Sequence, residues 1–202
     1  MPSPPDLFQL TPALWLWQAF EPAIKSDLFA SALKTAGEIF LIDPIPLPVA
    51  SLEAMVAGAT VRAILLTNAN HLRAAADFAH QFGRPILAAA GIPPEIESAK
   101  WKAIPADGRI AAGVTAIPID GAAVGEVAFH FGDEGGTLVL GDALINFEPY
   151  GFSFLPPKYC ADQRKMRGSL RQLLDWPCER LLFAHGPPIL ADAHARLETL
   201  LR

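Results

Sequence analysis

The sequence predicts a layered α/β protein in which two packed mixed sheets lie face to face with helices outside. Apolar segments of strand length alternate with helical patterns, and a β-rich and then α order occurs twice along the 202 residues. Several connections look like hairpins, and no Gly-x-Gly-x-x-Gly motif follows a strand, which excludes a doubly wound dinucleotide-binding sheet. Apolar residues make up 51% of the chain and charged residues 18%, enough for a full core. We therefore expect residues 1–202 to form a single domain.

The first half of the chain contains most of the expected strands. Residues 34–37 are typical of a turn between two strands, and the three prolines that follow at positions 44, 46 and 48 favour an extended loop. Ser51 is a candidate N-cap, and Gly58 and Gly83 are candidate helix ends. The predicted strands are residues 14–17, 28–33, 38–43, 61–66 and 85–88, and the predicted helices are residues 51–56 and 74–82.

The second half begins with a region dense in proline and glycine, residues 91–105, which we expect to have little regular structure. From residue 114 the residue pattern again favours strands, which are separated by glycines. The predicted strands are residues 114–119, 127–131, 137–140 and 180–184, and the predicted helices are residues 164–174 and 192–201.

Charge and hydropathy exclude several classes of partner. The net charge of −5 and the pI near 5.5 argue against nucleic acid, which needs a basic face. No apolar run approaches the ~18 residues of a membrane span, so no membrane association is expected. The first residues lack the features of a signal peptide, and Cys160 and Cys178 are too few for a disulfide framework. A cytoplasmic location is the expectation.

Four strand-end segments carry a family resemblance. Residues 64–73 read Ile-Leu-Leu-Thr-Asn-Ala-Asn-His-Leu-Arg, a buried strand that ends in a polar turn before a helix. Together with residues 40–43, 138–144 and 182–188, this segment resembles the metallo-β-lactamase superfamily in order and separation. The resemblance implies an αββα sandwich. It also implies a two-metal hydrolytic site built from histidines and carboxylates at strand ends.

The metal ligands that the resemblance implies are mostly replaced. In a gap-free register from Thr67, the family's His-x-His-x-Asp-His positions hold, in order, Asn68, Ala69, Asn70, His71, Leu72 and Arg73. Ala122 stands where a later loop of the family has its histidine. Asp142 and His185 match the bridging carboxylate and the final histidine. The first metal position therefore lacks all three imidazoles, and at most one metal is expected.

A second register shortens the loop by two residues. The family's last loop histidine commonly precedes an apolar helix residue by seven positions, and Phe78 lies seven residues after His71. In this register His71, Asp142 and His185 would hold one divalent metal, which could be zinc, iron or manganese. Asp142 and His71 would be the catalytic residues, with Asp142 orienting the attacking water. The sequence leaves both registers open.

A site without metal is the equal alternative. Arg73 could place its guanidinium where a metal charge would lie and form an ion pair with Asp142. Asn68 and Asn70, whose commonest role is an Asx turn, would then join Arg73 in binding a substrate or a small anion.

Two functions follow from these alternatives. The resemblance implies a metal-dependent hydrolase with a depleted, at most mononuclear site, acting on an ester, a thioester or a related small molecule. The alternative is a non-catalytic protein of the same fold that binds a small anion or a protein partner. A di-iron oxidoreductase would need the full ligand set. The sequence does not give the oligomeric state.

Overall fold

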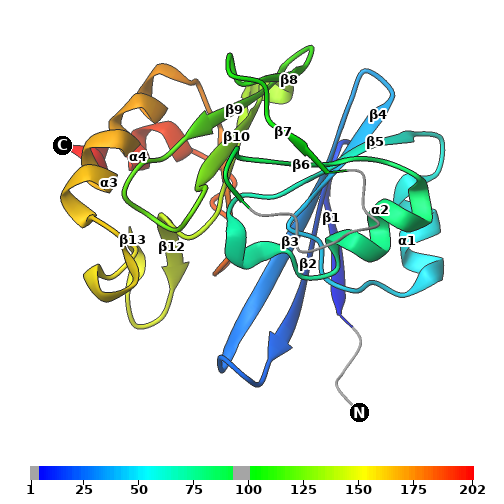
Figure 1. Cartoon of the computed structure of the whole chain (residues 1–202), viewed down its shortest axis with the longest axis horizontal. Helices are drawn as coiled ribbons and strands as arrows, with labels where there is room; N and C mark the ends of the chain where they lie inside the picture. The colour runs from blue at the N-terminus through cyan, green and yellow to red at the C-terminus, as the bar shows by residue number, and fades with distance from the viewer. Residues whose placement is uncertain (1–4, 93–100) are drawn as a thin grey trace.

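The computed structural model describes residues 5–92 and 101–202 (Figure 1). Its first sheet has seven strands whose spatial order follows the chain. Strands β1 to β4 pair antiparallel, whereas β4 to β7 pair parallel. The connection from β4 to β5 runs through α1 (Val49–Val56), and the connection from β5 to β6 runs through α2 (Ala75–Phe82). The strands are β1 (Asp6–Thr11), β2 (Leu14–Glu21), β3 (Ser26–Thr35), β4 (Glu38–Ile42), β5 (Thr60–Leu65), β6 (Ile86–Ala88) and β7 (Trp101–Ala103).

The second sheet has five strands in the order β14-β11-β10-β9-β8. Only β11 and β14 pair parallel, and the chain between them forms a hairpin, β12 (Leu144–Phe147) with β13 (Gly151–Phe154), and then α3 (Gln163–Leu170). A 3-10 segment, η4 (Arg171–Asp175), continues α3, and α4 (Ala193–Leu201) follows the last strand. The sheet strands are β8 (Arg109–Ala111), β9 (Val114–Pro118), β10 (Val127–Phe131), β11 (Thr137–Leu140) and β14 (Arg180–Phe183).

Three apolar layers hold these elements together. Phe40, Leu65 and Phe129 belong to the layer between the two sheets. Leu41, the chain neighbour of Phe40, belongs to the layer beneath α1 and α2, because successive side chains of a strand point to opposite faces. Met166 of α3 packs in a third layer on the far side of the second sheet. The protein is therefore an αββα sandwich, and the predicted fold class is confirmed (Figure 1).

Most predicted elements are present, with differences at their ends. The first helix begins at Val49 after Pro48, so Ser51 lies inside the helix and is not its N-cap. The helix expected over residues 164–174 is α3 followed by the 3-10 segment η4. Five strands were not predicted: β1, β7, β8, β12 and β13. Each is short, at a sheet edge or in a separate hairpin, so few apolar alternations mark it in the sequence. Of the region expected to be irregular, residues 93–100 lie outside the described residues.

Within the described part of the chain, no helix is both long enough and apolar enough to cross a membrane. Cys160 and Cys178 are both free thiols.

Candidate functional site

The polar residues of the site lie at strand ends that parallel pairing brings together. Asp43 follows β4 and Thr67 follows β5, and these two strands pair in parallel within the first sheet. Asp142 and His185 follow the parallel strands β11 and β14 of the second sheet. The backbone N–H of Val127 donates to the carbonyl of Thr67 at 2.7 Å, which joins the two sheets beside the site.

The turn after β5 places His71. The side chain of Asn68 accepts a hydrogen bond from the backbone N–H of Asn70 at 2.8 Å and so caps the 3-10 turn η1 (Ala69–His71). His71 at the end of this turn is 3% exposed. Its Nδ1 lies 2.9 Å from Asp43 Oδ2, and the Thr67 hydroxyl also donates to that carboxylate. Asp43 therefore fixes the orientation of the imidazole and directs Nε2 into the site.

Asp142 lies between two imidazoles. Its Oδ1 is 3.2 Å from His71 Nε2 and 3.4 Å from His185 Nε2. These donor atoms of His71, Asp142 and His185 all lie within 4.8 Å of one another. The structure therefore brings together the three residues that the shortened-loop register groups.

The other oxygen of Asp142 faces amides. Asn68 Nδ2 lies 3.1 Å and Asn70 Nδ2 3.3 Å from Asp142 Oδ2, and both donate to it. Asn68 Nδ2 also donates to Glu126 Oε2 at 2.8 Å, and Glu126 Oε1 accepts from the backbone N–H of Ala143 at 2.9 Å. Glu126 is 4% exposed, so a buried network fills the space on this side of Asp142.

Burial and neighbouring charges shift the pKa values of these groups in different directions. Burial opposes a charge on His71, but the Asp43 carboxylate and the hydrogen bonds to Asp142 and Asp43 outweigh it and raise the pKa of His71 to about 9. Burial also opposes a charge on Asp142, yet its hydrogen bonds to His185 and His71 hold its pKa well below the usual value. Burial, with the Asp142 charge, raises the pKa of Glu126 to about 8. Without a metal, His71 is therefore an imidazolium between two carboxylates.

Arg73 does not pair with Asp142 as the metal-free alternative expected. Its Nη1 donates to the carbonyl oxygens of Phe29 at 2.7 Å and of Asp43 at 3.1 Å, and among the described residues no hydrogen bond joins it to Asp142. Two backbone carbonyls of the first sheet, one within β3 and one just after β4, bind the guanidinium in place of a carboxylate on the other sheet. The cation that neutralises Asp142 in this structure is His71, and Arg73 lies behind Asp43.

The remaining predicted residues differ in their access to solvent. Asn68 is completely buried, so its amide serves the network and cannot touch a substrate, contrary to the binding role expected for it. Asn70 is exposed and remains available for substrate contact. Ala122 packs in the layer beneath α3 and is no part of the site.

Sequence reasoning missed three members of the site: Asp43, Thr67 and Glu126. Asp43 ends an apolar strand, and that position could have marked it as a site residue. Glu126 carries no such signal, because its role depends on Asn68, which lies 58 residues away in the sequence.

The donor set fits a single metal ion. A tetrahedral ion with bonds of about 2.0–2.1 Å to nitrogen and oxygen holds its ligands roughly 3.3 Å apart. Asp142 Oδ1 lies at nearly this separation from both imidazole nitrogens, at 3.2 and 3.4 Å. His71 further has its Nδ1 anchored on a carboxylate, as metal-binding imidazoles almost always have an anchored second nitrogen. Two imidazoles and a carboxylate would leave a fourth position for water.

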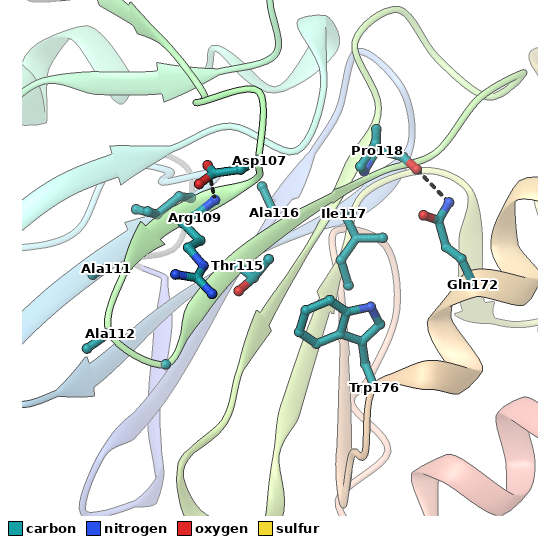
Figure 2. Close-up of a pocket in the computed structure, with 12 residues that line it drawn as sticks. Asp107, Arg109, Ala111, Ala112, Thr115, Ala116, Ile117, Pro118, Gln172 and Trp176 are labelled. Atoms are coloured by element: carbon teal, nitrogen blue, oxygen red, sulfur yellow. Dashed lines mark hydrogen bonds between the residues drawn. The ribbon is translucent and has the colours of Figure 1, made fainter.

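A groove of about 680 Å³ lies elsewhere, between β8, β9 and the 3-10 segment η4 (Figure 2). Its lining includes Arg109, Asp107 and Trp176, and Gln172 donates to the carbonyl of Pro118 across it at 2.8 Å. Asp107 and Arg109 are exposed, and the groove contains none of the strand-end residues described above. Its size alone therefore does not make it the site of chemistry.

Comparisons with known proteins agree with the fold. Solved metallo-β-lactamases resemble the chain over nearly their whole length. The Erythrobacter litoralis protein is 16% identical with a TM-score of 0.74, and the match covers 98% of this chain and 96% of that protein's chain. The Pontibacter korlensis protein is 13% identical with a TM-score of 0.73, and the match covers 98% of each chain. The Hirschia baltica protein is 16% identical with a TM-score of 0.70, and the match covers 99% of each chain. At such identities the likeness concerns the fold alone. No curated protein matches the chain. A family model described as the metallo-beta-lactamase superfamily matches residues 8–202, and the chain therefore belongs to that superfamily.

Proposed function

We propose that the protein is a metal-dependent hydrolase with a single divalent ion held by His71, Asp142 and His185. One observation carries the proposal: Asp142 Oδ1 lies 3.2 and 3.4 Å from the two imidazole nitrogens, the separations of ligands around one ion. Membership of a superfamily of metallohydrolases supports it. Zinc, iron and manganese all suit this set of nitrogen and oxygen donors.

A bound divalent ion would lower the pKa of a coordinated water and polarise a carbonyl or phosphoryl oxygen. The residues around it have separate tasks. Asp43 holds the His71 imidazole with Nε2 toward the ion, and Asp142 would both hold the ion and accept a hydrogen bond from the attacking water. Asn70, the exposed amide of the site, is placed to contact a substrate. We propose an ester, a thioester or a related small molecule as that substrate.

A second candidate function is supported by the charge balance of the site. With a pKa raised to about 9 by the Asp43 charge against the effect of burial, the His71 imidazolium forms ion pairs with both buried carboxylates without any metal ion. Such a site would bind a small anion or a protein partner and carry out no chemistry. Neither candidate involves nucleic acid or a membrane, and a cytoplasmic location remains a prediction from the sequence.

Metal content and hydrolysis together distinguish the two candidates. Protein purified without chelator is analysed for metals and then titrated with zinc, iron(II) and manganese. We expect one equivalent to bind and to activate hydrolysis within a panel of chromogenic esters and thioesters. Two tightly bound ions per chain would contradict the single-ion site, and no binding of any ion would favour the non-catalytic candidate.

A matched pair of variants assigns the binding to this site. His185→Ala should abolish both metal binding and hydrolysis. His80→Ala, which removes an exposed imidazole of α2, should change neither. Equal loss in both variants would show that the metal binds elsewhere.

A further inference from the structure

The two oxygens of Asp142 have different partners, and this difference determines how many ions the site can hold. Oδ1 faces the Nε2 atoms of His71 and His185. Oδ2 accepts one N–H from Asn68 at 3.1 Å and one from Asn70 at 3.3 Å. A carboxylate oxygen has two lone pairs, and both lone pairs of Oδ2 are used by these amides. Oδ2 is therefore closed to a second cation.

Glu126 holds this arrangement from two directions. Its Oε2 accepts from Asn68 Nδ2 at 2.8 Å, and that same amide nitrogen donates to Asp142. Its Oε1 accepts from the backbone N–H of Ala143, the residue that follows Asp142. Glu126 thus contacts the chain beside Asp142 and also the amide that holds the Asp142 side chain.

Close packing leaves this network little freedom. A Cβ atom built on Gly141 would lie 2.7 Å from Glu126 Oε1 and 2.6 Å from the Thr67 hydroxyl. Only glycine therefore allows the strand end before Asp142 to lie against the Glu126 carboxyl group. Together with the complete burial of Asn68, this contact fixes the distance between Glu126 and Asp142.

The geometry points to Glu126 as a positioning residue that keeps Asp142 Oδ1 toward the two histidines and Oδ2 bound to the asparagine amides. In this arrangement the amides take the place of a second cation on Asp142, which makes the site mononuclear. The part of the inference that concerns the metal rests on the proposed function. The part that concerns the placement of Asp142 does not, and it can be tested without any metal.

Glu126→Gln tests the role with little change in volume. Both carboxyl oxygens face N–H donors, so a glutamine must set its NH2 group against either Asn68 or Ala143, and both contacts lead to Asp142. The readout in metal-free protein is the set of imidazole ¹⁵N signals of His71 and His185, recorded at one fixed pH above the Glu126 pKa of about 8, where the wild-type side chain is a carboxylate. We expect both residues' signals to move in Glu126→Gln and to stay in place in the control Glu53→Gln, which changes an exposed residue of α1. Unchanged signals in folded Glu126→Gln would overturn the inference.

Should Glu126→Gln fail to fold, Asn68→Ala removes the amide that connects Glu126 to Asp142. The same movement of both imidazole signals is expected, and unchanged signals in the folded variant would again overturn the inference. Zinc affinity gives a second readout, with a loss of about 10–100-fold expected for either variant, the usual effect of removing a group that orients a metal ligand. If the wild-type protein binds none of zinc, iron(II) and manganese, the proposed function fails, while the imidazole signals still decide the role of Glu126.

Discussion

The two carboxylate oxygens of Asp142 belong to one side chain, but they face different chemical groups. On one side, His71 and His185 offer nitrogen donors suited to a metal ion. On the other side, Asn68, Asn70 and Glu126 form a closed hydrogen-bond network. The comparison teaches that the side of Asp142 without histidines is not a void. Amide N–H groups occupy Oδ2, the oxygen that a second ion would need, so this side is a filled network whose role can be tested.

Removing His71 should have the largest effect on stability, because it is the cation of the histidine side. His71→Ala leaves Asp43 and Asp142 buried without their shared partner, and orphaned buried charges cost about 3–5 kcal/mol. Urea unfolding at pH 7 measures this loss. His185→Ala serves as the comparison, since His185 contacts Asp142 alone and its side chain is 17% exposed, so a smaller loss than for His71→Ala is expected. Equal losses for the two variants would contradict the role of His71 as the shared partner of both carboxylates.

Asp142→Asn should prevent this side chain from accepting hydrogen bonds from the asparagines and binding a metal beside the histidines at the same time. An amide has one oxygen and one NH2 group, so it must set the NH2 group against either the histidines or the asparagines. We expect zinc affinity to fall by more than about 100-fold, beyond the 10–100-fold effect of residues that only orient ligands. Competition with a chromophoric chelator measures it. Asp77→Asn on the exposed face of α2 is the control, and retained affinity in Asp142→Asn would remove Asp142 from the ligand set.

Acidity should oppose metal binding on the histidine side. The Asp43 carboxylate, against the effect of burial, raises the pKa of His71 to about 9, so a metal at pH 7 must displace a proton from this imidazole. Affinity should therefore rise roughly tenfold per pH unit between pH 6 and 8. In the metal-free protein the same raised pKa stabilises the fold most below pH 6.5, and this contribution is lost as pH rises through 9. A flat zinc affinity between pH 6 and 8 would contradict a protonated His71.

Arg73→Ala should have the smallest effect on the site. The guanidinium binds the carbonyl oxygens of Phe29 and Asp43, and hydrogen bonds to a charged group contribute about 1.5–3 kcal/mol. We expect a stability loss of this size in urea unfolding, with zinc affinity unchanged within about threefold. A loss of zinc binding as large as that of Asp142→Asn would restore Arg73 to the site.

Much of the fold followed from local patterns in the sequence. The strand over residues 38–43, the helix that ends at Gly83 and the order of the strand-end motifs each depend on residues close together in the chain. The same holds for the candidate residues Asp142 and His185, each of which lies two residues after an apolar strand. Short edge strands such as β1 and β8 were missed because their pairing partners, not their own residues, determine them.

The sequence by itself determined which few histidine and carboxylate candidates stand at the strand ends, and its family resemblance predicted that three imidazoles of the first metal position are replaced. Only the tertiary structure decided how these residues meet. The packing of one sheet on the other brings Asn68 within 2.8 Å of Glu126 and His71 within 3.2 Å of Asp142, across separations of 58 and 71 residues. The direction of Arg73 was decided in the same way, by a carbonyl group of β3. Contacts between distant segments depend on how whole layers stack, and no local pattern in the chain records that geometry.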